Sequence, residues 1–203
     1  MTATDASEDD KTRPRWRLRR SVALIGLMGC GKTTVGGRLA GLIGADFRDA
    51  DAEIVEAAGM SIPEIFEKYG EQEFRDGEKR VIARLMNSDP LVLATGGGAF
   101  MAEETRAAIA GAGASVWLHA DLDTLVERTS RRKSRPLLNR GNPREILTEL
   151  IEARYPVYGQ ADIRVESPAR GAADDVARRA LDALIARDET LPPEARVLEL
   201  IDD

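Results

Sequence analysis

A glycine-rich turn between an apolar run and a helical pattern is the feature that most restricts how this chain can fold. Residues 24–40 read LIGLMGCGKTTVGGRLA, in which Gly26, Gly31, Lys32 and Thr33 fit the motif G-x-x-x-x-G-K-[ST]. Glycines let successive backbone N–H groups curl around a polyphosphate, and the helix N-terminus adds partial positive charge. Lys32 would reach the β- and γ-phosphates, and Thr33 would bind Mg²⁺. The segment therefore predicts a strand, a loop and a helix that bind a nucleoside triphosphate.

Short, largely apolar runs alternate with helical patterns along the rest of the chain. Helical patterns occupy residues 52–86, with breaks at Gly59 and Gly70, and later residues 144–158 and 172–187. Strands that alternate with helices favour a parallel sheet covered on both faces. We therefore predict a three-layer α/β/α fold of the P-loop NTPase type, with a mobile lid. Its five parallel strands are expected at residues 21–27, 45–51, 91–98, 114–120 and 161–166.

The size and composition of the chain favour one folded domain. With 203 residues and 43% hydrophobic content, the chain can bury one good core. We place this domain at residues 21–187 and expect the lid at residues 128–142. Residues 1–20 are expected to form a disordered leader. Residues 188–203, which include two adjacent prolines, are expected to form a C-terminal tail with no clear place in the fold.

Charge and cysteine content exclude several classes of partner. A net charge of −6 gives no support for general affinity toward nucleic acid or an anionic membrane. Cys30 is the only cysteine, which excludes an internal disulfide framework and fits a reducing cytoplasm. No apolar run approaches the roughly 20 residues of a membrane helix. We predict a cytoplasmic protein with no nucleic-acid or membrane partner, and a monomer because no unpaired apolar surface is obvious.

Polar residues and glycines near two other strand ends indicate where a phosphate acceptor would bind. Asp49 and Asp51 are two positions apart at a predicted strand end, and open α/β sheets bind ligands beyond such ends. One carboxylate near Mg²⁺ and one near an acceptor hydroxyl would suit phosphoryl transfer, although a solvated acidic turn gives the same pattern. Three glycines at residues 96–98 suggest close approach of a ligand to the backbone, and a tight turn would explain two of them. Arg75 lies on a predicted helix.

A basic stretch from Arg128 to Arg140 allows three explanations: a solvated charged loop, a nucleic-acid patch, or a mobile lid over the triphosphate. The nucleic-acid patch is disfavoured because the run lacks aromatic side chains for stacking. We favour the lid, because a phosphoryl-transfer site must exclude water and needs cationic groups that arrive on closure.

Three residues are assigned to structure and not to chemistry. His119 is predicted in an apolar strand, on the same face as Trp117 and without an evident partner carboxylate, so we expect a structural histidine. Gly36 and Gly37 lie inside the first predicted helix, past the phosphates. We expect both glycines to allow close packing of that helix on the sheet.

Six segments of the chain occur in the order and spacing of one enzyme family. They are GLMGCGKTT, FRDADAEI, SIPEIFEKYGEQEFR, LATGGGA, RPLL and ARYPVYGQAD. With these segments the chain resembles shikimate kinase over residues 21–185, nearly the whole predicted domain. The resemblance implies transfer of the γ-phosphate of ATP to the 3-hydroxyl of shikimate in aromatic amino acid biosynthesis. It also implies ATP and shikimate as the substrates and Mg²⁺ as the cofactor.

The resemblance assigns roles to individual residues. The residues expected to be catalytic are Lys32, Asp51 and Arg135. The residues expected to bind ATP are Gly29, Cys30, Gly31, Lys32, Thr33, Thr34, Arg128, Arg135, Ser167 and Pro168. The residues expected to bind shikimate are Asp51, Arg75, Gly96, Gly97, Gly98 and Arg154. Mg²⁺ would be held by Thr33 and Asp49.

Several of these implied roles depend on a specific chemical property. Asp51 would accept a hydrogen bond from the 3-hydroxyl and act as the base, and a loose transition state requires little deprotonation until late. Arg75 and Arg154 would bracket the shikimate carboxylate, a task that suits the guanidinium fork. Arg128 would lie against the adenine ring, and Arg135 would reach the phosphates from the lid.

Two other functions stay open from the residues alone. A related carbohydrate-acid kinase or nucleoside-monophosphate kinase would share the phosphate loop and differ in its acceptor. A GTP-dependent switch is disfavoured, because no N-K-x-D-like segment that would read guanine appears in the chain.

Overall fold

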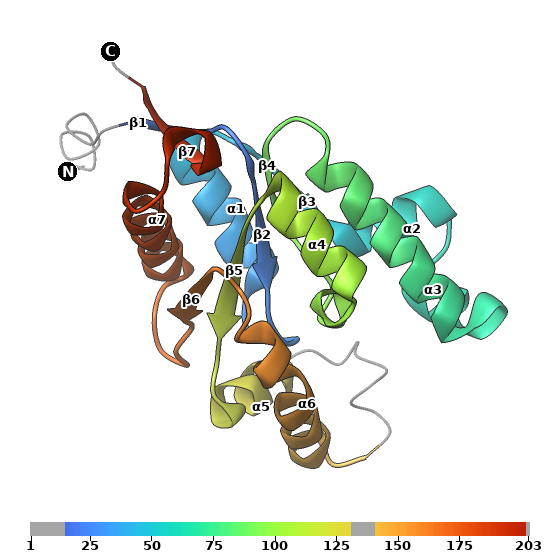
Figure 1. The fold of residues 1–203 in the computed structure, drawn as a ribbon. Helices are drawn as coiled ribbons and strands as arrows, with labels where there is room; N and C mark the ends of the chain where they lie inside the picture. Colours follow the sequence, from blue (N-terminus) through green and yellow to red (C-terminus); the bar gives the residue numbers. More distant parts are fainter. Residues whose placement is uncertain (1–14, 131–140, 202–203) are drawn as a thin grey trace, which may run out of the picture.

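A five-stranded parallel sheet forms the centre of the protein. The computed structural model describes residues 15–130 and 141–201. The strand order is β3-β4-β2-β5-β6, and each neighbouring pair is parallel (Figure 1). The strands are β2 Ser21–Ile25, β3 Asp46–Asp49, β4 Leu91–Ala94, β5 Gly113–His119 and β6 Ile163–Glu166. The predicted three-layer fold with five parallel strands is confirmed, although β2 and β4 end at Ile25 and Ala94, before the expected residues 27 and 98.

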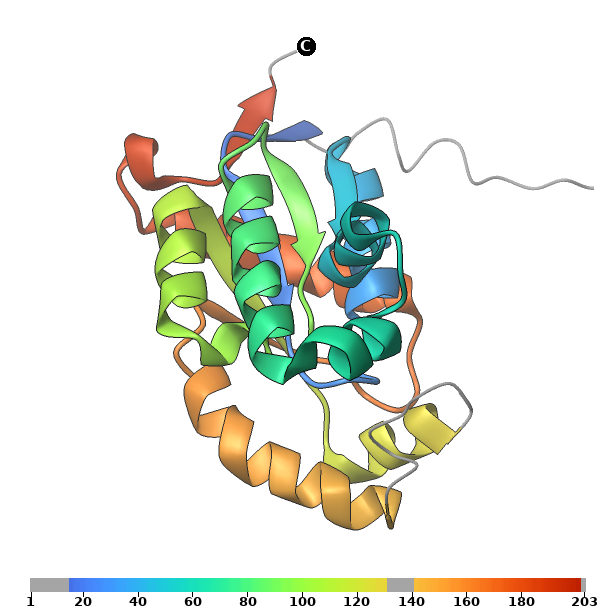
Figure 2. The ribbon, with the colours of Figure 1, turned by 90° about the vertical axis from the view of Figure 1, so that its right-hand side faces the viewer.

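Helices cover both faces of this sheet. α1 and α7 pack against each other on one face, and α3 and α4 lie together on the other. Figure 2 shows α5 and α6, in yellow and orange, beyond the carboxyl ends of the strands. α4 was not predicted from the sequence. The helices are α1 Lys32–Ile43, α2 Ala50–Ala58, α3 Ile62–Met86, α4 Glu103–Ala112, α5 Leu122–Ser130, α6 Pro143–Tyr158 and α7 Ala173–Glu189, with short 3-10 helices η1 Ala99–Met101 and η3 Pro193–Ala195.

The phosphate loop connects β2 to α1, as predicted. Gly26, Gly29 and Gly31 have φ angles of 140°, 90° and 100°, a region that glycine adopts without steric cost. A Cβ atom on Gly26 would also lie 2.7 Å from the carbonyl oxygen of Leu118 on β5. The loop conformation therefore depends on glycine at these positions.

The neighbouring strands β2 and β4 bring two glycine-rich turns to one edge of the sheet. Leu24 pairs with Ala94, and the backbone N–H and hydroxyl of Thr95 donate to the carbonyl oxygen of Leu24 at 3.1 and 3.0 Å. The triple glycine follows directly. A Cβ atom on Gly97 would lie 3.8 Å from the carbonyl oxygen of Gly26. The triple-glycine turn is thus held beside the phosphate loop.

The helical hairpin after β3 follows the predicted breaks. α2 ends at Gly59, which has φ 64°, and α3 begins with Ser61 as its N-cap. Ser61 and Glu64 form a reciprocal capping box, which satisfies backbone groups at the helix start. Gly70 interrupts α3 with φ 82° and ψ 173°. In residues 15–130 and 141–201, no helix is long and apolar enough to cross a bilayer.

The two ends of the described chain form a second, two-stranded sheet. β1 Arg15–Leu18 pairs antiparallel with β7 Leu198–Ile201, at the end of the molecule opposite α5 and α6 (Figure 1). The expectation of a disordered leader through residue 20 was therefore wrong for β1, and the C-terminal tail has a place in the fold. Residues 1–14 and 202–203 lie outside the described part.

Buried groups hold this terminal sheet in place. Leu18 is buried in the main core. The buried carboxylate of Asp188 accepts hydrogen bonds from the backbone N–H groups of Val197 at 2.8 Å and Leu198 at 2.7 Å. Hydrogen bonds from buried N–H groups to a carboxylate are stronger than neutral ones. Asp188 therefore fixes the chain where it turns into β7.

The two glycines inside α1 differ in their surroundings. A Cβ atom on Gly36 would lie 2.5 Å from Phe47 Cε2 and 3.0 Å from Leu24 Cδ1, so this position allows close packing of α1 on the sheet, as predicted. A Cβ atom on Gly37 would meet nothing within 4 Å, and the residue is exposed. The packing role predicted for Gly37 was wrong, because Gly37 points away from the sheet.

This difference gives a matched test of the fold. Gly36→Ala should lower the free energy of unfolding by about 1–3 kcal/mol, because the added methyl group overpacks the helix–sheet contact. Gly37→Ala should raise it by about 0.5–1 kcal/mol, because alanine loses less backbone freedom in a helix. Urea denaturation of both variants measures the two changes. Shifts of the same sign would contradict the packing described here.

Candidate active site

The side chain of Lys32 folds back onto the phosphate loop. Its Nζ atom donates hydrogen bonds to the carbonyl oxygens of Gly26 at 2.7 Å and Leu27 at 3.1 Å. The sulfur of Cys30, a fully buried residue, lies 3.8 Å from the same atom. The ammonium group is therefore held against the loop that would surround a phosphate.

Thr33 and Asp49 place two oxygen atoms side by side at the start of α1. The Thr33 hydroxyl donates to Asp49 Oδ2 at 2.8 Å. Asp49 also caps α2, because its Oδ1 atom accepts from the backbone N–H of Asp51 at 3.1 Å. Hydroxyl and carboxylate oxygens are ligands that Mg²⁺ prefers, and a few protein ligands suffice when phosphates supply others. This pair fits a magnesium ion that binds together with a nucleotide.

Asp51 belongs to a helix and not to a strand end. β3 ends at Asp49, and Asp51 lies in the first turn of α2. The prediction of a strand through residue 51 was therefore wrong at its end. The helix begins here because the Asp49 side chain satisfies the first backbone N–H groups of α2. Both carboxylates still lie at the edge where the phosphate loop is found.

Arg128 of α5 connects the phosphate loop to the loop after β6. Its guanidinium donates to the Ser167 hydroxyl at 2.9 Å and to the carbonyl oxygen of Pro168 at 2.6 Å. The guanidinium also donates to the carbonyl oxygen of Gly29 at 3.4 Å. The Ser167 hydroxyl donates to the carbonyl oxygen of Cys30 at 2.8 Å. These residues, all expected to bind ATP, therefore lie together.

Of the other residues predicted to bind the nucleotide, Gly31 and Thr34 lie at the start of α1, and Arg135 lies outside the described residues. Gly31 caps the start of α1, and Thr34 is exposed in the first turn of that helix. Arg135 and most of the predicted lid lie outside the described residues.

The triple glycine is required by side chains that come from other elements. A Cβ atom on Gly96 would overlap Glu78 Oε1 and lie 2.9 Å from Asp51 Oδ1. A Cβ atom on Gly98 would lie 2.7 Å from Arg75 Nη1. The turn therefore lacks side chains because charged groups of α2 and α3 occupy the space. A tight turn alone would explain two of the three glycines, whereas the close approach of these charged groups explains why Gly96 and Gly98 both lack a side chain.

Arg154 reaches the same turn from α6. Its Nη1 atom donates to the carbonyl oxygen of Gly97 at 2.8 Å. The same atom would lie 3.6 Å from a Cβ atom added to Gly97. Arg75 approaches the next residue of the turn, Gly98. The two arginines predicted to bind one carboxylate are thus both in contact with the triple-glycine turn.

Glu78 is a site residue that the sequence did not reveal. It is 2% exposed and accepts a hydrogen bond from Arg75 Nη1 at 2.8 Å, one helical turn away. Its other oxygen, Oε1, has no hydrogen-bond partner among the described residues and faces the Gly96 backbone. The spacing Arg-x-x-Glu was present, but a helix this rich in charge gave no reason to single out one carboxylate.

Asp51 lies where the two halves of the site meet. Burial raises the pKa of its carboxyl group, the neighbouring charge of Asp49 raises it further, and the charges of Lys32 and Arg75 oppose this. Burial likewise raises the pKa of Glu78. A carboxylate that is partly desolvated between a lysine and an arginine is a suitable proton acceptor.

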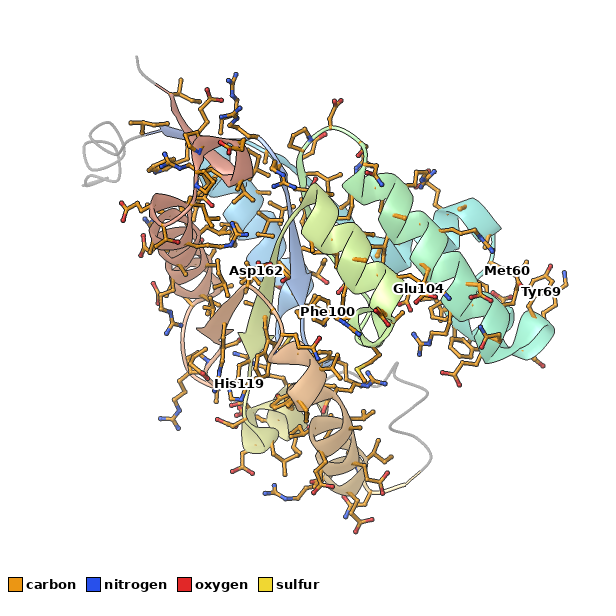
Figure 3. All side chains as sticks on the ribbon, in the orientation of Figure 1. Met60, Tyr69, Phe100, Glu104, His119 and Asp162 are labelled. Carbon is orange, nitrogen blue, oxygen red and sulfur yellow. The ribbon has the colours of Figure 1, made fainter. Side chains whose placement is uncertain are left out.

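His119 has a partner carboxylate, which the sequence did not predict. Its Nδ1 atom lies 2.6 Å from Glu166 Oε2, and its ring meets the edge of Trp117 at a centroid distance of 5.0 Å. Figure 3 shows His119 near the end of β5, well away from Met60 and Tyr69 at the α2–α3 hairpin. The ring is packed among aromatic groups, as expected for a structural histidine.

The fold and this site define a P-loop kinase of a small molecule. A phosphate loop with Lys32 and a magnesium-type oxygen pair lies on one side of Asp51. Two guanidinium groups at a triple-glycine turn lie on the other side. The first half fits a nucleoside triphosphate, and the second fits an acceptor that carries an anionic group.

Comparison with known proteins identifies the family. The chain belongs to the shikimate kinase family, whose sequence model matches residues 28–185. Shikimate kinase of Paramagnetospirillum magneticum is 56% identical over 151 residues, which cover 74% of this chain and 77% of that protein. Shikimate kinase of Novosphingobium aromaticivorans is 58% identical over 158 residues, 76% and 82% of the two chains. The structure of the Acinetobacter baumannii shikimate kinase in complex with shikimate has a TM-score of 0.79 and 40% identity, and the match covers 85% of this chain and 96% of that one.

The buried carboxyl group of Glu78 gives a prediction about stability and pH. The pKa of this carboxyl group is raised in the folded state above the ordinary value of 4.5. The folded protein therefore binds the carboxyl proton more tightly than the unfolded chain does. As the pH rises from 4.5 through the raised pKa, ionisation of Glu78 therefore destabilises the fold increasingly. In Glu78→Gln this titration is absent. The free energy of unfolding of the variant, relative to the wild type, should rise from pH 4.5 toward neutrality, by about 1.4 kcal/mol per unit of pKa elevation.

Glu71→Gln is the matched control for this measurement. Glu71 contacts the same Arg75 at 3.3 Å, but its side chain is 69% exposed. Denaturant unfolding at several pH values should show no such slope for Glu71→Gln. A relative stability of Glu78→Gln that is flat or falls with pH would contradict the described environment of Glu78.

Proposed function

We propose that this protein is a shikimate kinase that transfers the γ-phosphoryl group of ATP to the 3-hydroxyl of shikimate. The observation that carries the proposal is the contact of Arg75 and Arg154 with the triple-glycine turn, beside Asp51 and the phosphate loop. An acceptor with both a carboxylate and a hydroxyl matches this combination of charges. The 40% identical relative from A. baumannii was solved in complex with shikimate, which supports the same acceptor here.

The donor side would hold ATP by its phosphates. Lys32 would turn from the loop carbonyl oxygens to the transferring phosphoryl group, and the backbone N–H groups of the loop would surround the β-phosphate. Thr33 and Asp49 would hold Mg²⁺, which when bound would neutralise charge on the β- and γ-phosphate oxygens. The guanidinium plane of Arg128 would stack on the adenine ring.

The acceptor side would orient the hydroxyl for attack. The guanidinium groups of Arg75 and Arg154 would bind the shikimate carboxylate, and Glu78 would hold Arg75 in place. The 3-hydroxyl oxygen attacks the γ-phosphorus as the bond to the β–γ bridging oxygen breaks, and ADP leaves. The hydroxyl proton passes to Asp51, whose raised pKa suits it to accept a proton. Catalysis then depends on positioning and charge neutralisation.

Several further assignments stay predictions. Ser167 and Pro168 would form the second wall of the adenine site, and Arg135 would reach the phosphates from a lid at residues 128–142. The kinase domain would span residues 21–187. We also expect a cytoplasmic location and a monomer.

A coupled assay of ADP release tests the proposed function. With saturating ATP and Mg²⁺, shikimate should give a kcat/KM at least about 100-fold above that of gluconate or AMP, because those acceptors hold their anionic group and hydroxyls at other distances and would misplace the attacking oxygen. Circular dichroism of the same sample confirms that it is folded. Equal turnover with gluconate, or none with shikimate, would contradict the proposal.

A further inference from the structure

Two tyrosines at the end of α6 donate hydrogen bonds to two different loops. The Tyr158 hydroxyl donates to the carbonyl oxygen of Gly97, in the triple-glycine turn. The Tyr155 hydroxyl donates to the carbonyl oxygen of Ala120, at the junction of β5 and α5. Both donors come from the turn of helix that also carries Arg154. The helix end is thus attached to the acceptor side by one tyrosine and to the start of α5 by the other.

The Tyr158 ring is held firmly. The residue is 1% exposed and fully inside the main core. Its ring meets Trp117 at a centroid distance of 6.1 Å and Phe100 at 6.4 Å, both edge-on. Phe100, labelled in Figure 3, belongs to the 3-10 helix that directly follows the triple glycine. A ring packed in this way leaves its hydroxyl little freedom to leave the Gly97 carbonyl oxygen.

The Tyr158 hydroxyl acts as a donor over the whole neutral range. Burial raises its pKa to about 12, so the group keeps its proton. The carbonyl oxygen of Gly97 receives two hydrogen bonds, one from this hydroxyl and one from Arg154 Nη1 at 2.8 Å. A carbonyl oxygen has two lone pairs, and both are therefore used.

This sharing determines where the Arg154 guanidinium lies. The Tyr158 hydroxyl and Arg154 Nη1 both donate to this oxygen, and the hydroxyl also interacts directly with Arg154, so the three groups constrain one another. Without the hydroxyl, the carbonyl group is less constrained, and among the described residues Arg154 remains its side-chain donor. The guanidinium would then follow the carbonyl oxygen and present its remaining N–H groups to the substrate less well.

We propose that Tyr158 is a positioning residue for the acceptor pocket, whose hydroxyl fixes the Gly97 carbonyl group and thereby the Arg154 guanidinium. The inference rests on the proposed function, because it names the carboxylate of shikimate as the group that Arg154 binds. Tyr158 itself does not touch the reacting atoms.

The test compares Tyr158→Phe with Tyr155→Phe. Each variant loses one tyrosine hydroxyl of the same helix that donates to a backbone carbonyl oxygen, and each keeps the ring. Tyr158→Phe should raise the KM for shikimate about 5-fold to 10-fold, the loss expected when one hydrogen bond from Arg154 to the carboxylate is weakened, while the KM for ATP and kcat change less than about 3-fold. Tyr155→Phe should leave the KM for shikimate within about 2-fold of the wild-type value.

A thermal shift measurement provides a second readout that needs no turnover. Saturating shikimate should raise the melting temperature of Tyr158→Phe less than that of the wild type, while saturating ATP raises both equally. An unchanged KM and an unchanged shikimate shift in Tyr158→Phe would overturn the proposal, as would equal increases of the KM in both tyrosine variants. A wild-type protein without shikimate turnover would overturn the proposed function and this proposal with it. An active wild type with an unaffected Tyr158→Phe overturns the positioning role alone.

Discussion

The pairing of β2 with β4 is the interaction on which the site depends. These neighbouring parallel strands end at the same level, and Thr95 ties the end of β4 to Leu24 by both its backbone and its hydroxyl. The phosphate loop follows one strand and the triple glycine follows the other. Any register change between the two strands would separate the donor loop from the acceptor turn. A two-substrate site therefore arises from the backbone pairing of two central strands.

Charged side chains around this edge have hydrogen-bond partners within the protein. Lys32 lies on loop carbonyl oxygens, Asp49 on the Thr33 hydroxyl, and Glu78 on Arg75. Burial and the neighbouring charge of Asp49 raise the pKa of Asp51, and the charges of Lys32 and Arg75 only partly oppose this. The protein thus keeps the Asp51 carboxylate basic at the meeting point of the two halves.

The sequence predicted those parts of the protein that depend on neighbouring residues. The phosphate loop and the breaks at Gly59 and Gly70 depend on backbone conformations that glycine favours locally. Glu78 was missed because its burial depends on the Gly96 backbone, which comes from another element. The pairing of β1 with β7 joins segments at opposite ends of the chain, and local patterns carry no trace of such a partner. The end of β3 was misplaced because Asp49 acts as a helix cap, which moves Asp51 into α2.

The measurement that tests this account most directly is calorimetric titration of Asp51→Asn with ATP, together with its turnover of shikimate. If Asp51 serves the acceptor hydroxyl, turnover should fall by about 10²-fold to 10⁴-fold, because the proton acceptor is lost. The affinity for ATP with Mg²⁺ should stay within about 3-fold of the wild-type value, because Thr33 and Asp49 remain. A loss of ATP affinity as large as the loss of turnover would contradict the account, since Asp51 would then belong to the nucleotide side.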